Sequence, residues 1–144
     1  MNAPVAPVAP VAPPPSDYTE SIRALATPFE GKKVHVTSFP EKKERNVRKV
    51  VLPEHAQAEP LVAIFDLTTF GSAKDAAVFT PTHCYAHELD ERAAFALCDL
   101  QAVHGFEGML EAKIAVEIRG VGRITMPCGS VGDLLLTVLQ GLAR

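Results

Sequence analysis

Tryptophan is missing from this 144-residue chain, and aromatic residues make up only 6% of it. A carbohydrate site or a platform for stacking single-stranded bases needs exposed aromatic faces, so this scarcity argues against both. The three cysteines, Cys84, Cys98 and Cys128, include no C-x-x-C pair, which is the usual sign of a zinc ribbon or a thioredoxin-type redox site. We therefore expect neither a metal nor a cofactor.

Long hydrophobic runs are also lacking, because no stretch approaches the ~20 apolar residues that a membrane-spanning helix needs. The first basic residue is Arg23, so the N-terminus lacks the basic start of a secretory signal peptide. These absences predict a protein with no membrane partner and a cytoplasmic location.

What the N-terminus does have is a repeat of Ala, Pro and Val over residues 3–15 that ends in three prolines. Proline at every third position excludes helix and central strand and favours polyproline II. We interpret residues 1–15 as a flexible polyproline-type arm and residues 16–144 as a single domain. The arm is either a solvated spacer or a tether that reaches a partner.

The hydrophobic periodicity of residues 16–144 predicts alternating groups of helices and strands. The expected helices are Tyr18–Ala26 (begun by Asp17 and Glu20), Asp90–His104, and a last one capped by Ser130 and Asp133. The expected strands are Lys33–Phe39, Val47–Leu52, Leu61–Leu67, Ala76–Thr80, Lys113–Arg119 and Arg123–Met126. This order predicts an α+β fold, with a mainly antiparallel sheet of about five strands and two or three helices packed on one side.

The clearest electrostatic feature is a basic window between Glu30 and Lys49. It holds seven basic residues against three acidic ones, in a chain whose net charge is −3. Its basic residues are Lys32, Lys33, Lys42, Lys43, Arg45, Arg48 and Lys49. With the strands predicted above, these residues lie on a β-hairpin that spans residues 32–49. We expect the surface of this hairpin to be a candidate site for nucleic acid or another anion. The alternative is a solvated hairpin whose charges discourage edge-to-edge pairing.

Two other groups of residues offer candidate chemistry. Cys128 comes just before the last predicted helix, whose N-terminal field would favour a thiolate nucleophile, with His83, His87 or His104 as the base. His83, Cys84 and His87 are rich in metal-binding atoms, and a helix would place the two histidines on one face. The structural alternatives are a tight strand-to-helix turn at Cys128 and two surface histidines in a loop.

Arg45-Asn46-Val47-Arg48, followed by Asp66-Leu67-Thr68-Thr69-Phe70-Gly71, is similar to the arginine pair and the D-x-S-x-x-G motif of PilZ domains. The family pattern is R-x-x-x-R, so the arginine spacing here is one residue short, and Thr68 replaces the serine. The resemblance covers about a quarter of the chain and implies binding of cyclic di-GMP.

No convincing catalytic set emerges from these motifs. We therefore expect a non-enzymatic binding or assembly module that acts in a homo-oligomer or multiprotein complex. The leucine-rich last helix and the arm motivate this expectation, because exposed apolar stripes usually become interfaces. The alternatives are nucleic-acid binding through the basic hairpin, cyclic-dinucleotide binding, or a Cys/His-dependent enzyme.

Overall fold

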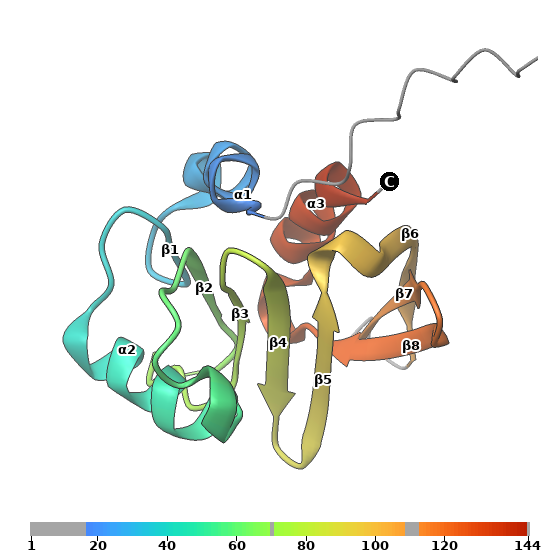
Figure 1. The fold of residues 1–144 in the computed structure, drawn as a ribbon. Helices are drawn as coiled ribbons and strands as arrows, with labels where there is room; N and C mark the ends of the chain where they lie inside the picture. The colour runs from blue at the N-terminus through green and yellow to red at the C-terminus, as the bar shows by residue number, and fades with distance from the viewer. Residues whose placement is uncertain (1–16, 70, 109–112, 144) are drawn as a thin grey trace, which may run out of the picture.

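A computed structural model of the chain describes residues 17–69, 71–108 and 113–143. The predicted arm, residues 1–15, lies outside these described residues. The fold is α+β, as predicted, with a mainly antiparallel five-stranded sheet, a second three-stranded sheet and three α-helices (Figure 1).

The five-stranded sheet follows the chain without crossovers, and every neighbouring pair of its strands is antiparallel. Its strands are β1 (Val34–His35), β2 (Ala63–Asp66), β3 (Ala76–Phe79), β4 (His83–Glu88) and β5 (Glu91–Ala96). The second sheet is a meander of β6 (Leu100–Glu107), β7 (Lys113–Ile118) and β8 (Gly122–Pro127). Contacts between β5 and β8 join the two sheets at a corner (Figure 1).

The inner strands of the larger sheet, β2 and β3, are buried on both faces, whereas the edge strand β5 is largely exposed. Along β2, Phe65 belongs to one apolar cluster, shared with both sheets and with α1 (Thr19–Ala26) and α3 (Gly132–Leu142). The neighbouring Ile64 belongs to a second cluster, formed with Val47 and Val51. This two-sided burial explains why residues 61–67 are apolar almost throughout. The prediction that all helices pack on one side is wrong, because helical segments cover both faces.

The segment that was expected to be the second strand of a basic hairpin is helical. α2 (Glu41–Asn46) continues directly into η2 (Val47–Val51), a turn of π-helix. Val47 and Val51 are almost fully buried against the sheet, so their β-branched side chains pack from a helix and not from a strand. β1 pairs with β2, and the predicted hairpin 32–49 does not exist.

The predicted helix Asp90–His104 is also wrong, because this segment forms β5, a short 3₁₀ turn η4 (Leu97–Asp99) and most of β6. The chain bends between the sheets at η4, and β6 contains two bulges, between Leu100 and Ala102 and between Val103 and Gly105. The bend and the bulges shift the alternation of apolar residues along the two strands. In the sequence the resulting spacing is similar to the apolar stripe of a helix.

The predicted N-terminal helix, hairpin 113–126 and C-terminal helix are confirmed. Val131 occupies the N-cap of α3 and no side chain caps it, so the predicted Ser130 cap is wrong. Leu135, Leu139 and Leu142 of α3 are buried in the core of the same chain. The leucine-rich helix therefore no longer supports an intermolecular interface.

α1 and α3 pack against each other, and Gly141 makes their close approach possible. A Cβ atom at Gly141 would lie 2.6 Å from Cδ2 of Leu25, well inside van der Waals contact. The start of α1 and the end of α3 lie on the same side of the molecule, away from α2 (Figure 1).

Candidate anion-binding surface

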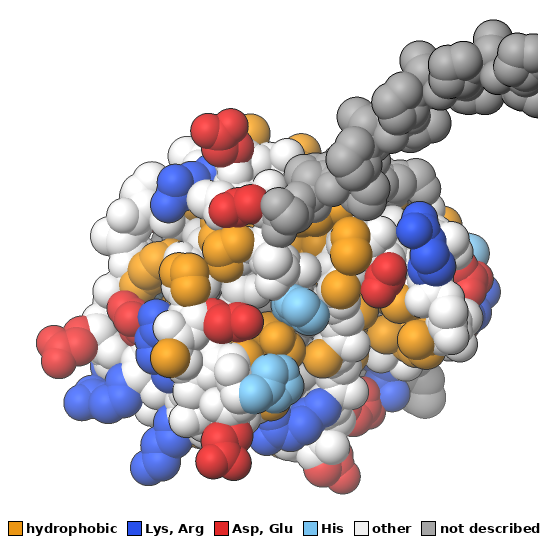
Figure 2. All heavy atoms as spheres, viewed as in Figure 1, with side chains coloured by type: hydrophobic (Ala, Val, Ile, Leu, Met, Phe, Trp, Pro, Cys, Tyr) orange, Lys and Arg blue, Asp and Glu red, His pale blue; other side chains and the backbone are white. Residues whose placement is uncertain are grey.

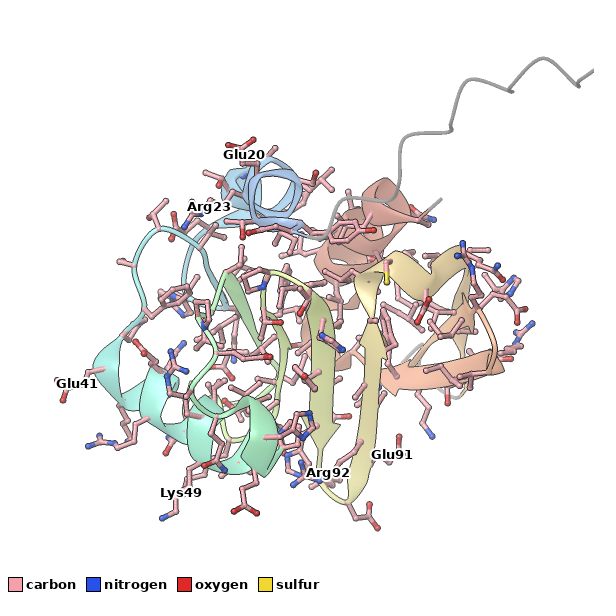
Figure 3. The ribbon with its side chains drawn as sticks, in the orientation of Figure 1. Glu20, Arg23, Glu41, Lys49, Glu91 and Arg92 are labelled. Carbon is pink, nitrogen blue, oxygen red and sulfur yellow. The ribbon has the colours of Figure 1, made fainter. Side chains whose placement is uncertain are left out.

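The α2–η2 helix is positioned by its sequence at both ends. Pro40 precedes the first turn with an extended backbone, and Glu41 and Glu44 place negative charge near the helix N-terminus, where it is favourable. At the other end, the Arg92 guanidinium of β5 donates to the carbonyls of Val50 (3.0 Å) and Val51 (3.4 Å). Figure 3 shows Arg92 beside this end of the helix. The helix is thus fixed to the sheet before any ligand arrives.

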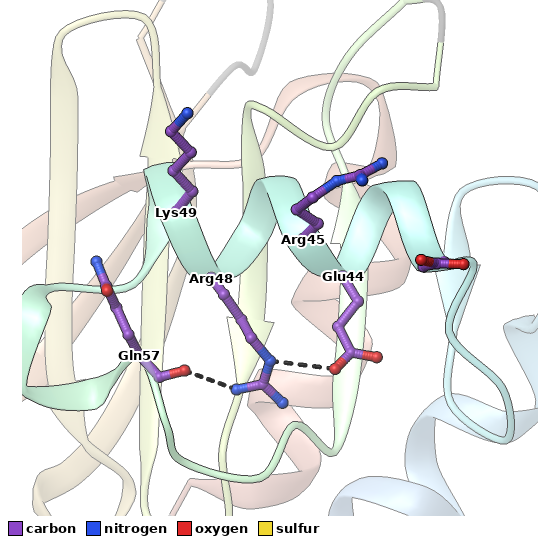
Figure 4. A pocket seen from close by; sticks show the side chains of 6 residues that line it. Glu44, Arg45, Arg48, Lys49 and Gln57 are labelled. Carbon is purple, nitrogen blue, oxygen red and sulfur yellow. Dashed lines mark hydrogen bonds and ion pairs between the residues drawn. The ribbon is translucent and has the colours of Figure 1, made fainter.

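Three cations form a stripe along the solvent face of this helix. Lys42, Arg45 and Lys49 are spaced i, i+3 and i+7, which places them on one side. All three are exposed, and their side chains make no hydrogen bond or ion pair within the described part of the chain. Figure 4 shows Arg45 and Lys49 extending away from Arg48 and Gln57. We call these three residues the α2 stripe.

Arg48 has a structural role instead. Its guanidinium donates to Glu44 at 3.1 Å and to the carbonyls of Gln57 (2.8 Å) and Glu59 (2.7 Å). These bonds tie the helix to the loop that follows it (Figure 4). They also engage Glu44, one of the acidic residues that lowered the charge of the basic window.

The side chain of Lys43 is nearly buried on the inner face of α2. Its ammonium group lies 2.9 Å from Asp66 Oδ2, 3.0 Å from His35 Nε2 and 2.7 Å from the Lys32 carbonyl oxygen. The Lys43 side chain is 12% exposed and that of Asp66 is 0% exposed. The sequence singled out Asp66 and Lys43 separately, but no local signal paired them, because 22 residues separate them along the chain.

The environment of this ion pair changes two pKa values. Burial alone would raise the pKa of Asp66, but hydrogen bonds from Thr68 and Lys43 outweigh it and hold the pKa below its ordinary value. Burial and the neighbouring Lys43 charge lower the pKa of His35. His35 is therefore neutral at pH 7 and accepts a hydrogen bond from Lys43.

The loop after β2 is held in shape by its own side chains. Asp66 accepts hydrogen bonds from the amide (2.9 Å) and hydroxyl (2.5 Å) of Thr68. The Thr68 hydroxyl oxygen in turn accepts from the amides of Gly71 (3.0 Å) and Ser72 (2.9 Å). The residues that resemble the PilZ D-x-S-x-x-G motif thus form a compact turn, with Phe70 outside the described residues.

This turn lies against α2, so the two segments that resemble the PilZ motifs are neighbours. The Asn46 side-chain amide donates to the Ser72 carbonyl at 2.7 Å, beside the Lys43–Asp66 pair. However, Asp66 and Arg48 are both engaged within the protein. Arg45 is the one charged member of the resemblance that faces solvent.

Two hollows flank the helix. One, of about 550 Å³, is lined by Glu41, Glu44, Arg45, Arg48, Lys49 and Gln57. The other, of about 410 Å³, is lined by Lys32, Lys33, His35, Pro40, Lys43, Thr69 and Gly71. All seven basic residues proposed from the sequence thus lie on or beside this helix. Figure 2 shows Lys and Arg side chains over the part of the surface where α2 lies, with acidic groups between them.

The Cys/His candidates offer no comparable site. His83, Cys84 and His87 lie on strand β4 and not in a loop or helix; Cys84 is buried, and burial raises the pKa of its thiol. Cys128 is also fully buried, which keeps substrates away from its sulfur. Within the described ranges, no three His, Cys, Asp or Glu side chains come close enough to hold a metal ion.

Within the same ranges, no helix is long and apolar enough to cross a membrane. No protein-family model, curated protein or solved structure matches this chain.

Proposed function

We propose that this chain is a non-enzymatic binding module that binds nucleic acid along the α2 stripe. One observation carries the proposal: Lys42, Arg45 and Lys49 share one exposed helical face and pair with no group in the described part of the chain. Surface cations without partners keep their charge available for phosphates, and displacement of counterions then drives binding.

Two of the three glutamates that weaken the basic window in sequence have partners within the chain. Glu44 pairs with Arg48, and Glu30 accepts hydrogen bonds from the Val36 and Thr37 amides. Glu41 is the one acidic residue of the window that lies exposed on α2. Glu44 is thus offset by Arg48, and the three cations of the stripe outnumber the exposed Glu41 beside them.

The α2 stripe is also long enough to contact several phosphates of a nucleic acid. Seven residues of helix span about 10 Å, which corresponds to about three phosphate steps of one strand of a duplex. A duplex whose axis lies parallel to the helix therefore presents phosphates along the whole length of the stripe.

Binding of labelled DNA and RNA at several salt concentrations tests this proposal. We expect Lys42→Ala/Arg45→Ala/Lys49→Ala to weaken binding and to reduce the slope of log K against log salt by about two to three. The matched control is Arg23→Ala/Lys74→Ala/Arg119→Ala, which removes three exposed cations elsewhere and changes the net charge equally. Equal losses in both variants, or no salt-dependent binding by the unmodified protein, would refute a specific role for the stripe.

Cyclic di-GMP is a second candidate ligand. The contact of Asn46 with Ser72 supports it, because this contact brings the two segments that resemble the PilZ motifs together. Arg45 is then the residue available to contact a phosphate. Calorimetric titration of cyclic di-GMP should show binding that Arg45→Ala weakens, while Lys74→Ala leaves it unchanged. If titration of the unmodified protein with cyclic di-GMP produces no heat of binding, this ligand is excluded.

A further inference from the structure

The hollow beside the start of α2 differs from the α2 stripe in its residues and its shape. β1 and the residues before it supply Lys32, Lys33 and His35, α2 supplies Lys43, and the loop after β2 supplies Thr69 and Gly71. None of the described residues that line it is acidic, whereas the larger hollow on the other side of the helix contains Glu41 and Glu44. We call it the lysine hollow.

Two of its three lysines form no ion pair with an acidic side chain in the part of the chain that the structure describes. Lys43 is balanced by Asp66, and its three donors are used by Asp66, His35 and the Lys32 carbonyl. Lys33 donates to the Thr68 carbonyl, which leaves two of its N–H groups unused. Lys32 is exposed, and its ammonium group has no partner among the described residues. The hollow therefore has an excess of about two positive charges.

The loop after β2 leaves the floor of the hollow open. Gly71 has a φ of +83°, and a Cβ atom there would lie 3.8 Å from Lys43 Nζ and 3.9 Å from Asp66 Oδ2. A side chain at this position would enter the space above the ion pair. The exposed Thr69 adds a hydroxyl donor at the rim.

We propose that the lysine hollow binds a phosphate monoester between the ammonium groups of Lys32 and Lys33. A monoester carries a charge of about −1.5 to −2 at pH 7, which matches the two uncompensated charges of Lys32 and Lys33. A phosphodiester carries only one charge and would leave one lysine uncompensated. The group is either the terminal phosphate of a nucleic acid or the phosphate of a small molecule, and both present the same dianion.

The test compares two oligothymidines of equal length, one with a 5′-phosphate and one with a 5′-hydroxyl, and uses inorganic phosphate as a separate probe. We expect the phosphorylated oligomer to bind about fivefold or more tightly. A preference without binding of inorganic phosphate identifies a nucleic-acid end. Calorimetric binding of inorganic phosphate alone identifies a small-molecule phosphate.

Variants separate this site from the stripe. Lys32→Gln should abolish the preference, and because the Lys32 ammonium has no internal contact the fold should be unaffected. Lys42→Ala/Arg45→Ala/Lys49→Ala should weaken both oligomers and keep their ratio. Equal affinity of the two oligomers together with no binding of inorganic phosphate would overturn the proposal, as would a preference that survives Lys32→Gln. If the α2 stripe binds no nucleic acid and neither oligomer binds, the inorganic phosphate experiment decides alone: binding that Lys32→Gln removes supports the lysine hollow, and no binding overturns it.

Discussion

The two faces of the α2–η2 helix carry similar cations in opposite situations. On the inner and lateral faces, Lys43 and Arg48 are surrounded by acceptors that the protein itself supplies. On the outer face, Lys42, Arg45 and Lys49 are exposed and have no polar partner among the described residues. A count of basic residues treats these five as equal. The structure shows that two of them hold the helix in place and three remain available to a ligand.

Among substitutions on the two faces of the helix, Lys43→Met should give the largest loss of stability. It leaves the Asp66 carboxylate buried without its counter-charge, so we expect the free energy of unfolding to fall by about 3–5 kcal/mol. Urea denaturation measures the change. The neighbouring exposed position provides the control, because Lys42→Met should change stability by no more than about 0.5 kcal/mol. A loss below about 1 kcal/mol for Lys43→Met would mean that the buried pair is dispensable.

Arg48→Ala should be the next most destabilising change. It removes charge-assisted hydrogen bonds to Glu44 and to two loop carbonyls, for which we expect a loss of about 1–3 kcal/mol. Arg45→Ala, three residues away on the exposed face, should remain within about 0.5 kcal/mol of the unmodified protein. Thermal or urea unfolding compares the two variants. Similar losses for both would remove the distinction between the faces.

His35 should add a smaller, pH-dependent effect. Its pKa in the folded chain lies below the ordinary value of 6.5, because of burial and of Lys43, while Asp66 and Glu30 oppose the shift. Between the lowered pKa and 6.5, the unfolded chain binds more protons than the folded chain. The free energy of unfolding should therefore fall as the pH is lowered below about 6.5.

Urea denaturation between pH 5 and pH 8 measures this dependence. His35→Gln, which cannot be protonated in this range, should flatten the profile below pH 6.5. His55→Gln is the matched control, since His55 is exposed. Identical profiles for His35→Gln and the unmodified protein would show that the histidine does not contribute.

Periodicity predicted the fold class and most of the strands, but it failed where long-range packing decides the local structure. The valines at 47, 50 and 51 favour a strand by propensity, yet they lie in a helix because the second core cluster needs an apolar helical face against β3 and β4. Conversely, Leu89 to His104 has helical spacing but folds into strands that bend at η4 and bulge near Gly105.

The candidate site shows a similar division. The seven basic residues and Asp66 are visible in the sequence, because their charge and composition are local properties. Which of them are free is not local: Asp66, the Gln57 carbonyl and the Glu59 carbonyl reach Lys43 and Arg48 only through the fold. The sequence did not predict that His35 belongs to the site. The alternation of apolar and polar residues in Lys33–Phe39 indicates only that His35 lies on a strand.

The packing of Leu25 on Gly141 has a practical consequence for experiments with this protein. α1 and α3 are held together on one side of the molecule, so a linker attached after α3 lies on the side away from α2 (Figure 1). Immobilisation through the end of α3 therefore leaves the α2 stripe facing the solution. A surface-based binding measurement in that orientation reports on these cations without obstruction by the support.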